Sequence, residues 1–268
     1  MTEIGEYQNC EVSELGKDNL MREFLFTMVC FLLSNPAFSE DRASVLIRQL
    51  ERNSRGVSFS GDLSMVVTQK GKERKMSVHV ISRGTETALV RILEPSRDRG
   101  TGNLRIKTDL WQYLPRVNKT IKVPSSLLYQ SWMGSDFSND DLVKASSFER
   151  DYKHNYIGED KLGDITAEKI ESTPKPEAKI VWGKVILWLT PREGALLQQD
   201  FYAENGKLIK QLKGFELKAF GKYHIPTRMT MQDFSRKESL TEITYSKVEF
   251  DKPLKDEVFT LKELEKPL

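Results

Sequence analysis

The stretch that decides the fold is LQQDFYAENGKLIKQLKGFEL, residues 197–217. Asn205-Gly206 is the strongest turn signal in the chain, because a type I′ turn needs positive φ at both central residues. The pair predicts a tight hairpin that joins a strand over residues 197–202 to a strand over residues 208–217. Antiparallel strands linked by short turns are therefore the expected unit of structure.

The same pattern extends in both directions from this hairpin. Gly221-Lys222 supplies the next turn, and a turn at Gly71-Lys72 precedes Met76, Val78 and Val80, which alternate with polar residues. Turn signals about every 8 to 12 residues predict about ten to eleven strands, and no helix-length segments separate them. The fold class is therefore mainly β and antiparallel, and a parallel α/β fold is excluded.

Several strands are apolar on both faces, notably residues 185–189, so both sides of the sheet need cover. Ala43, Leu46, Ile47 and Leu50 fall at helical spacing and predict one amphipathic helix. A second, short helix is expected over residues 140–145, capped by Ser138 or Asn139. Since two helices cover little of such a sheet, the barrel either closes on its own side chains or keeps a cavity for a hydrophobic guest.

The N-terminal region has the pattern of a secretory signal. Residues 24–33 are apolar, too few for a bilayer span of about 20 residues, and Ser34-Asn35-Pro36 and Ala37-Phe38-Ser39 follow them. We expect an upstream extension over residues 1–20, a signal peptide over residues 21–39 cleaved after Ser39, and one domain over residues 40–268. Translation starts at Met1 or Met21, and a buried core helix is the alternative to the signal.

Cleavage at that site would remove both cysteines, Cys10 and Cys30, so no disulfide is expected in the remaining chain. The whole chain has 41 basic and 39 acidic residues, a formal net charge of +2, and no block of five or more like charges. This balance argues against a nucleic-acid partner.

Sequence motifs for catalysis or metal binding are absent. His79, His154 and His224 lack metal-ligand spacing, and there is neither a Gly-x-Ser-x-Gly elbow nor a phosphate-binding loop. We therefore expect no catalytic residue, no metal and no cofactor, and the protein is predicted not to be an enzyme.

Three further stretches resemble the outer-membrane lipoprotein-sorting (LolA-like) family of exported bacterial proteins. They read RDRGTGNL at residues 97–104, WQYLP at residues 111–115 and SWMGSDFSNDDL at residues 131–142. The resemblance covers most of residues 60–262. It implies an unclosed antiparallel β-barrel in the periplasm, with a few short helices on its concave apolar side, that carries or senses the acyl chains of lipids or lipoproteins. It also implies an inner-membrane exporter or a lipoprotein-release complex as partner.

Burial of an acyl chain gains about 0.8 kcal/mol per methylene, and flexible or aromatic side chains suit such a lining. For each candidate the alternative is ordinary core packing. The predicted lipid-binding residues are Met65, Trp111, Tyr113, Trp132, Met133, Phe137, Trp188, Phe201, Met229 and Met231.

Two further groups complete the expected site. Arg97, Arg99 and Arg116 are candidates for contact with an anionic headgroup, or they are solvated outward faces of strands. Gly134-Ser135-Asp136 is expected to form a turn before the short helix, with positive φ at Gly134 and an Asx turn at Asp136, and to act as a hinged lid.

The first functional hypothesis is a periplasmic carrier for lipid or lipoprotein acyl chains. The second is a lipid-sensing regulatory or exporter-accessory protein. The third is a lipid hydrolase using Ser135, Asp136 and His154, for which no motif fixes the geometry.

Overall fold

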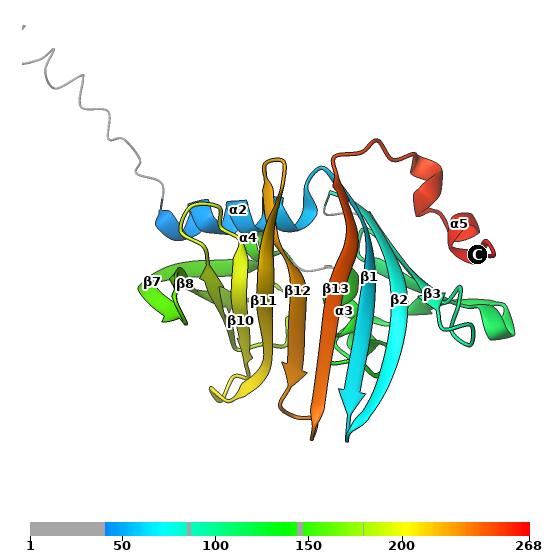
Figure 1. Ribbon diagram of the computed structural model, residues 1–268, viewed down its shortest axis with the longest axis horizontal. Helices are drawn as coiled ribbons and strands as arrows, with labels where there is room; N and C mark the ends of the chain where they lie inside the picture. Colours follow the sequence, from blue (N-terminus) through cyan, green and yellow to red (C-terminus); the bar gives the residue numbers. More distant parts are fainter. Residues whose placement is uncertain (1–40, 85–86, 144–146, 179) are drawn as a thin grey trace, which may run out of the picture. The chain divides into compact units, whose positions relative to one another are not determined.

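The computed structural model describes residues 41–84, 87–143, 147–178 and 180–268. The predicted extension, signal peptide and both cysteines lie outside the described residues. Residues Asp41–Leu268 form one unit, and its framework is a single antiparallel sheet (Figure 1).

In the described part of the chain the sheet has 13 strands. They are β1 (Ser58–Gln69), β2 (Lys72–Arg83), β3 (Thr87–Glu94), β4 (Gly102–Ile106), β5 (Asp109–Leu114), β6 (Lys119–Val123), β7 (Tyr152–Leu162), β8 (Ile165–Pro174), β9 (Lys184–Leu189), β10 (Leu196–Tyr202), β11 (Leu208–Phe220), β12 (Tyr223–Asp233) and β13 (Ser239–Phe250).

The strand order runs β6-β5-β4-β3-β2-β1-β13-β12-β11-β10-β9-β8-β7, so β6 and β7 are the two edges. The chain starts in the middle of the sheet, proceeds outward to one edge, crosses to the other and returns to pair β13 with β1. The mainly-β, unclosed architecture is confirmed. The spacing of turn signals predicted about ten to eleven strands, which is too few, because β4, β5 and β6 contain only five or six residues each.

The hairpin at Asn205-Gly206 joins β10 to β11 as expected, but the prediction of a type I′ turn was wrong. Of the two residues only Gly206 has a positive φ, +80°. Gly206 N donates to Ala203 O (2.9 Å), and the register shifts between Phe201 and Tyr202. A turn followed by a left-handed glycine and a bulge achieves the same chain reversal with one positive φ.

Helix α2 (Arg42–Arg55) forms where the apolar stripe predicted it. Asp41 caps its start by accepting from Ser44 N, and Gly56, with φ +58°, ends it. The predicted residues Ala43, Leu46, Ile47 and Leu50 are all buried.

The other helices are short: α3 (Asn139–Val143), α4 (Phe148–Asp151) and α5 (Leu261–Glu265), with 3₁₀ turns η1 (Pro115–Val117), η2 (Ser125–Leu127), η3 (Trp132–Gly134) and η4 (Asp256–Phe259). Of the two predicted caps for α3, Ser138 is used. Asp141 N donates to Ser138 Oγ (3.1 Å), and Ser138 N donates to Asp141 Oδ2 (2.8 Å). This reciprocal pair fixes the start of α3.

Apolar side chains are buried on both faces of the sheet. Ala88 and Val90 belong to the main core, on the concave side with α2, whereas Leu89 between them packs with Leu264 of α5. Alternate residues of a strand point to opposite faces, so α5 covers the convex side of β4 and β5, and the segment Asp256–Phe259 just before it covers that of β3 and β4.

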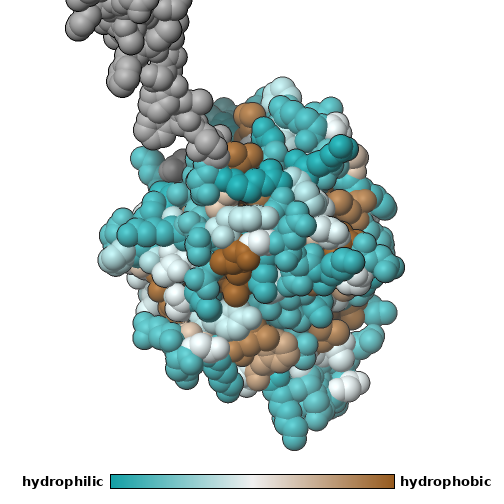
Figure 2. Space-filling model, turned by 90° about the vertical axis from the view of Figure 1, so that its left-hand side faces the viewer, coloured by the Kyte–Doolittle hydropathy of each residue, from teal (hydrophilic) through white to brown (hydrophobic). Residues whose placement is uncertain are grey.

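The outer face at the β7–β8 end is largely hydrophilic, and its apolar residues form separate small groups (Figure 2). Within the described residues, none of the helices is long and apolar enough to cross a membrane.

Candidate functional site

An apolar cavity of about 240 Å³ lies on the concave side, between α2 and the central strands. Its volume is slightly below the range of about 300–1,000 Å³ typical of sites for drug-sized ligands. The apolar part of its wall includes Leu50, Phe59, Leu63, Met65, Val80, Ala88, Phe137, Phe201, Leu212, Met229, Met231, Ile243 and Tyr245.

Methionines of β1 and β12 lie on this wall in a row with an isoleucine of β13, the strand between them. Met65 of β1 pairs with Ile243 of β13, which in turn pairs with Met229 of β12. Met231 follows two residues later on the same face and is buried. Methionine side chains adapt to irregular shapes, so this row gives the cavity a deformable floor.

The other end of the cavity carries polar groups that are already engaged. Glu51 of α2 accepts from Phe148 N (2.6 Å) and from Arg55 Nε (2.7 Å). Burial raises the pKa of the Tyr152 phenol above its ordinary value, so that side chain stays neutral. Glu51 is therefore satisfied within the protein, and Tyr152 offers no charge to a guest.

Five of the ten predicted lining residues lie on the cavity wall: Met65, Phe137, Phe201, Met229 and Met231. Their contact with a lipid remains a prediction.

The other five predicted residues do not line the cavity. Trp111 and Tyr113 pack with the convex cluster under α5, and Trp188 belongs to a third cluster in which its Nε1 donates to Asp160 Oδ2 (3.0 Å). Trp132 is buried in the main core with its Nε1 donating to Asn103 Oδ1 (2.9 Å), and Met133 packs against that core. Residue type alone does not tell which face of a strand a side chain occupies.

The candidate headgroup residues Arg97, Arg99 and Arg116 are exposed and do not line the cavity. They sit at the ends of β3 and β5, in the loops that lead to β4 and β6. If the cavity holds an acyl chain, these residues do not contact it there.

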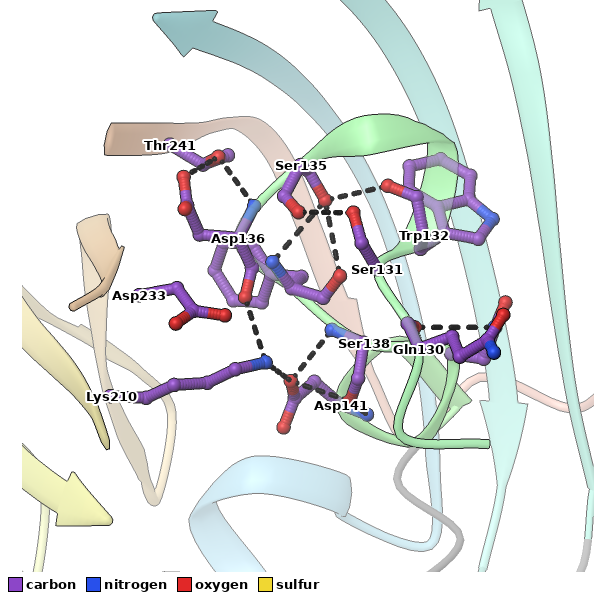
Figure 3. Close-up of polar contacts among 12 residues, drawn as sticks. Gln130, Ser131, Trp132, Ser135, Asp136, Ser138, Asp141, Lys210, Asp233 and Thr241 are labelled. Atoms are coloured by element: carbon purple, nitrogen blue, oxygen red, sulfur yellow. Dashed lines mark hydrogen bonds and ion pairs between the residues drawn. The ribbon is translucent and has the colours of Figure 1, made fainter. Parts of the chain in front are cut away.

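Residues 131–141, here called the plug, occupy the concave side and contribute Phe137, Asp140 and Asp141 to the cavity wall. Figure 3 shows how polar contacts hold them. Trp132 N donates to Phe137 O (2.8 Å), which closes a tight loop around Gly134-Ser135-Asp136. Gly134 has the expected positive φ, +73°.

Asp136 does not form the expected Asx turn. Its carboxylate accepts from Thr241 Oγ1 (2.7 Å), and its backbone N donates to the same oxygen (2.9 Å). Lys210 Nζ donates to Asp136 O (3.1 Å), and Lys210 is itself buried (Figure 3). Two strands that are distant in sequence thus hold this residue.

Two arginines fix the outer side of the plug. Arg236 Nη2 donates to Gly134 O (2.7 Å) and its Nη1 to Ser135 O, while Arg74 donates to Met133 O. Ser135 and Asp136 are 0 % and 1 % exposed. Gly134 is exposed, so the tripeptide has one surface residue and two buried ones. Its role as a hinged lid remains a prediction.

The partners of the plug were missed at the sequence level. Lys210 and Thr241 lie 74 and 105 residues from Asp136, beyond any local signal. One signal was available, because Lys210 has the same parity in β11 as the buried Leu212 and so points inward.

The residues of the hydrolase hypothesis make their hydrogen bonds elsewhere. Ser135 Oγ donates to Trp132 O (2.8 Å), and the two ring nitrogens of His154 bond Ser172 Oγ (2.9 Å) and Phe148 O (3.0 Å). With Asp136 bonded to Thr241, the three residues do not form a relay.

A family model matches residues 84–266, more than half of the chain, and its description is a DUF1329-like "Uncharacterized protein". The chain belongs to this family. No curated protein matches the chain in sequence.

Three solved structures share the fold of this DUF1329-like chain. A DUF1329 family protein from Desulfovibrio piger has a TM-score of 0.76 at 22% identity, over 82% of this chain and 97% of the other. A domain from Vibrio parahaemolyticus, described as outer membrane lipoprotein-sorting, has a TM-score of 0.73 at 21% identity, over 84% and 99%.

A LolA superfamily protein from Nitrosomonas europaea has a TM-score of 0.70 at 23% identity, over 82% of this chain and 98% of the other. At these identities the likeness establishes the fold. The half-barrel of this DUF1329-like chain is the LolA-like fold.

Proposed function

We propose that the protein is a periplasmic carrier for lipid or for the acyl chains of lipoproteins. The observation that supports this best is the apolar cavity of about 240 Å³ with its row of methionines. The LolA-like fold of the solved relatives supports a carrier rather than a catalyst, and the proposal involves no covalent step.

Physical chemistry makes such a cavity sufficient for transport. Each methylene removed from water contributes about 0.8 kcal/mol, so even part of an acyl chain is held reversibly. The deformable wall of Met65, Met229 and Met231 lets the cavity widen for more of the chain. The proposed periplasmic location relies on the signal predicted over residues 21–39, and the proposed partner is an exporter or lipoprotein-release complex of the inner membrane.

A cavity-filling variant tests the proposal. Ala88 is buried on the cavity wall, so Ala88→Phe places a ring in the space that a ligand would use. We expect this variant to keep its thermal stability and to lose most of its affinity for a fluorescent fatty-acid probe.

Ala219→Phe is the matched control, because Ala219 is exposed on β11 away from the cavity wall. It should bind the probe like the unmodified protein. Equal probe binding by both variants, or no saturable binding by the unmodified protein, would refute the carrier proposal.

A further inference from the structure

Four exposed basic residues gather at one end of β3, β4, β5 and β6. Arg97 and Arg99 lie in the β3–β4 loop, and Arg116 and Lys119 lie at the β5–β6 turn. These four residues and Val117 are here called the basic tip. Arg97 Nε approaches Asp98 Oδ1 at 3.4 Å, and the described chain provides no ion pair for the other three.

The two loops of the basic tip are in contact. A Cβ built on Gly100 would lie 3.6 Å from Pro115 Cγ, which is ordinary van der Waals distance. In the sheet below them, Gly102 pairs with Tyr113 and Leu114 pairs with Lys119. The four cations therefore belong to one surface rather than to two separate loops.

The β5–β6 turn has a fixed shape. Pro115 begins the 3₁₀ turn η1, Asn118 takes the left-handed conformation (φ +45°), and Asn118 N donates to Pro115 O (3.2 Å). Tyr113 Oη donates to Asn118 Oδ1 (3.0 Å), which anchors the turn from within the sheet. Arg116 and Lys119 are thus presented in a preorganised arrangement.

The apex of the turn is apolar. Val117, between Arg116 and Asn118, is 66 % exposed. Of the carboxylates nearby, Glu263 pairs with Lys266 (3.6 Å). Glu265, which accepts from Thr120 Oγ1 (2.6 Å), and exposed Glu94 at the end of β3 each keep a negative charge, so the excess of positive charge at the tip is modest. An exposed aliphatic side chain among unpaired cations suits the headgroup region of a bilayer.

We propose that the basic tip docks the protein on an anionic phospholipid surface. Val117 contacts the headgroup–acyl boundary, and Arg99, Arg116 and Lys119 neutralise lipid phosphates around it. The inference rests on the proposed function only in that a lipid carrier is expected to meet a phospholipid membrane. It also gives Arg97, Arg99 and Arg116 a role outside the cavity, in which they have no place.

The same cations do not form a platform for single-stranded nucleic acid. Such a platform needs exposed aromatic faces on which bases stack. Tyr113 is buried with its hydroxyl bonded to Asn118, and Lys122 Nζ lies 5.6 Å from the centre of the Trp111 ring.

Co-sedimentation of the full chain with vesicles tests the inference. We compare vesicles of phosphatidylcholine with an equimolar mixture of phosphatidylcholine and phosphatidylglycerol. The unmodified protein should bind the mixed vesicles in excess of the neutral ones, and added salt should reduce this excess. The triple variant Arg99→Gln/Arg116→Gln/Lys119→Gln should reduce it about 100-fold, and Val117→Asp about tenfold.

The matched control is Lys153→Gln/Lys161→Gln/Lys218→Gln, which removes the same charge from exposed positions on β7 and β11. It should retain the excess binding within about threefold. Equal losses in both triple variants, no preference for anionic vesicles, or tighter binding of a single-stranded oligonucleotide than of vesicles would overturn the inference.

Probe binding separates this inference from the carrier proposal. The basic-tip variants should bind the fluorescent fatty acid as the unmodified protein does. Vesicle docking without probe binding refutes the carrier proposal alone, and probe binding without vesicle docking refutes the docking inference alone.

Discussion

Two regions cover the concave side of the sheet, and different interactions hold them there. Helix α2 covers it with an apolar stripe, in which Leu46 is 0 % and Ile47 is 1 % exposed. The plug covers it with a polar network in which Asp136 and Lys210 are buried. Apolar burial tolerates small shifts because it is non-directional, whereas a buried charge is tolerated only with its partners in place.

This difference indicates which region depends more strongly on the exact position of its partners. The Asp136 carboxylate is fully buried, accepts from Thr241 through one oxygen, and has its other oxygen 3.5 Å from Arg236 Nη1. Each partner comes from a different part of the chain, so the plug network forms only when the sheet has its final register. Four variants test this comparison, from the largest expected effect to the smallest.

The largest effect is expected from Asp136→Ala. Removal of the carboxylate leaves Thr241 Oγ1 without its acceptor in a buried site and leaves Arg236 with only its two carbonyl acceptors, so the free energy of unfolding should fall by about 4 kcal/mol. Urea denaturation measures the change. The control is Asp256→Ala, which breaks the Arg83–Asp256 pair where the aspartate side chain is 86% exposed, and it should change little. Similar losses of unfolding free energy in both variants would show that the plug network contributes no more to stability than an exposed ion pair does.

Leu46→Ala probes the apolar cover. The side chain is fully buried under α2, and its truncation leaves a cavity that should cost about 3 kcal/mol. Arg52→Ala, at an exposed position of the same helix, should leave the unfolding midpoint unchanged. An unfolding midpoint of Leu46→Ala close to that of the unmodified protein would mean that α2 contributes little to stability.

The sequence predicted these two regions unequally. The apolar stripe of α2 and the Ser138 cap of α3 are local patterns, and both were found in the residues themselves. The plug depends on Lys210, Arg236 and Thr241, whose proximity to Asp136 follows from sheet topology rather than from spacing. Local patterns therefore located the elements, and only the three-dimensional structure located the network.

The cavity lining follows the same rule. Met229 and Met231 both lie on the wall because alternation in one strand places both on one face, and their contact with a lipid remains a prediction. Trp111, Tyr113 and Trp188 were placed wrongly because their strands bury apolar residues on both faces, so size and aromaticity do not select the concave one.

Gly134→Val tests the plug as a moving part. Gly134 has φ +73°, so the valine adds strain of about 1–2 kcal/mol to the folded state. Gly71→Val is a matched control, since Gly71 in the β1–β2 turn has φ +72° and open space around it. We expect equal loss of thermal stability in both variants and weaker fatty-acid binding in Gly134→Val alone. Unchanged probe binding in a folded Gly134→Val protein would rule out the lid role.

The smallest effect concerns pH. Burial lowers the pKa of His154 below its ordinary value of 6.5, so the folded state binds its proton less readily than the unfolded state. The neutral ring therefore contributes fully to the free energy of unfolding above pH 6.5, and this contribution is lost as the pH falls toward the pKa of the folded state. Thermal denaturation against pH should show this loss, and His154→Gln should remove it. A pH profile that is identical in the variant would contradict the assignment.

The central claim is that the concave cavity takes an acyl chain, and photo-crosslinking with a diazirine-bearing fatty acid tests it most directly. Peptide mapping by mass spectrometry should locate saturable labelling on cavity residues of β1, β10 and β12, namely Met65, Phe201, Met229 and Met231. Excess unlabelled fatty acid should abolish this labelling. Labelling confined to the convex residues Ile186 and Trp188, or labelling that unlabelled fatty acid does not reduce, would contradict the account.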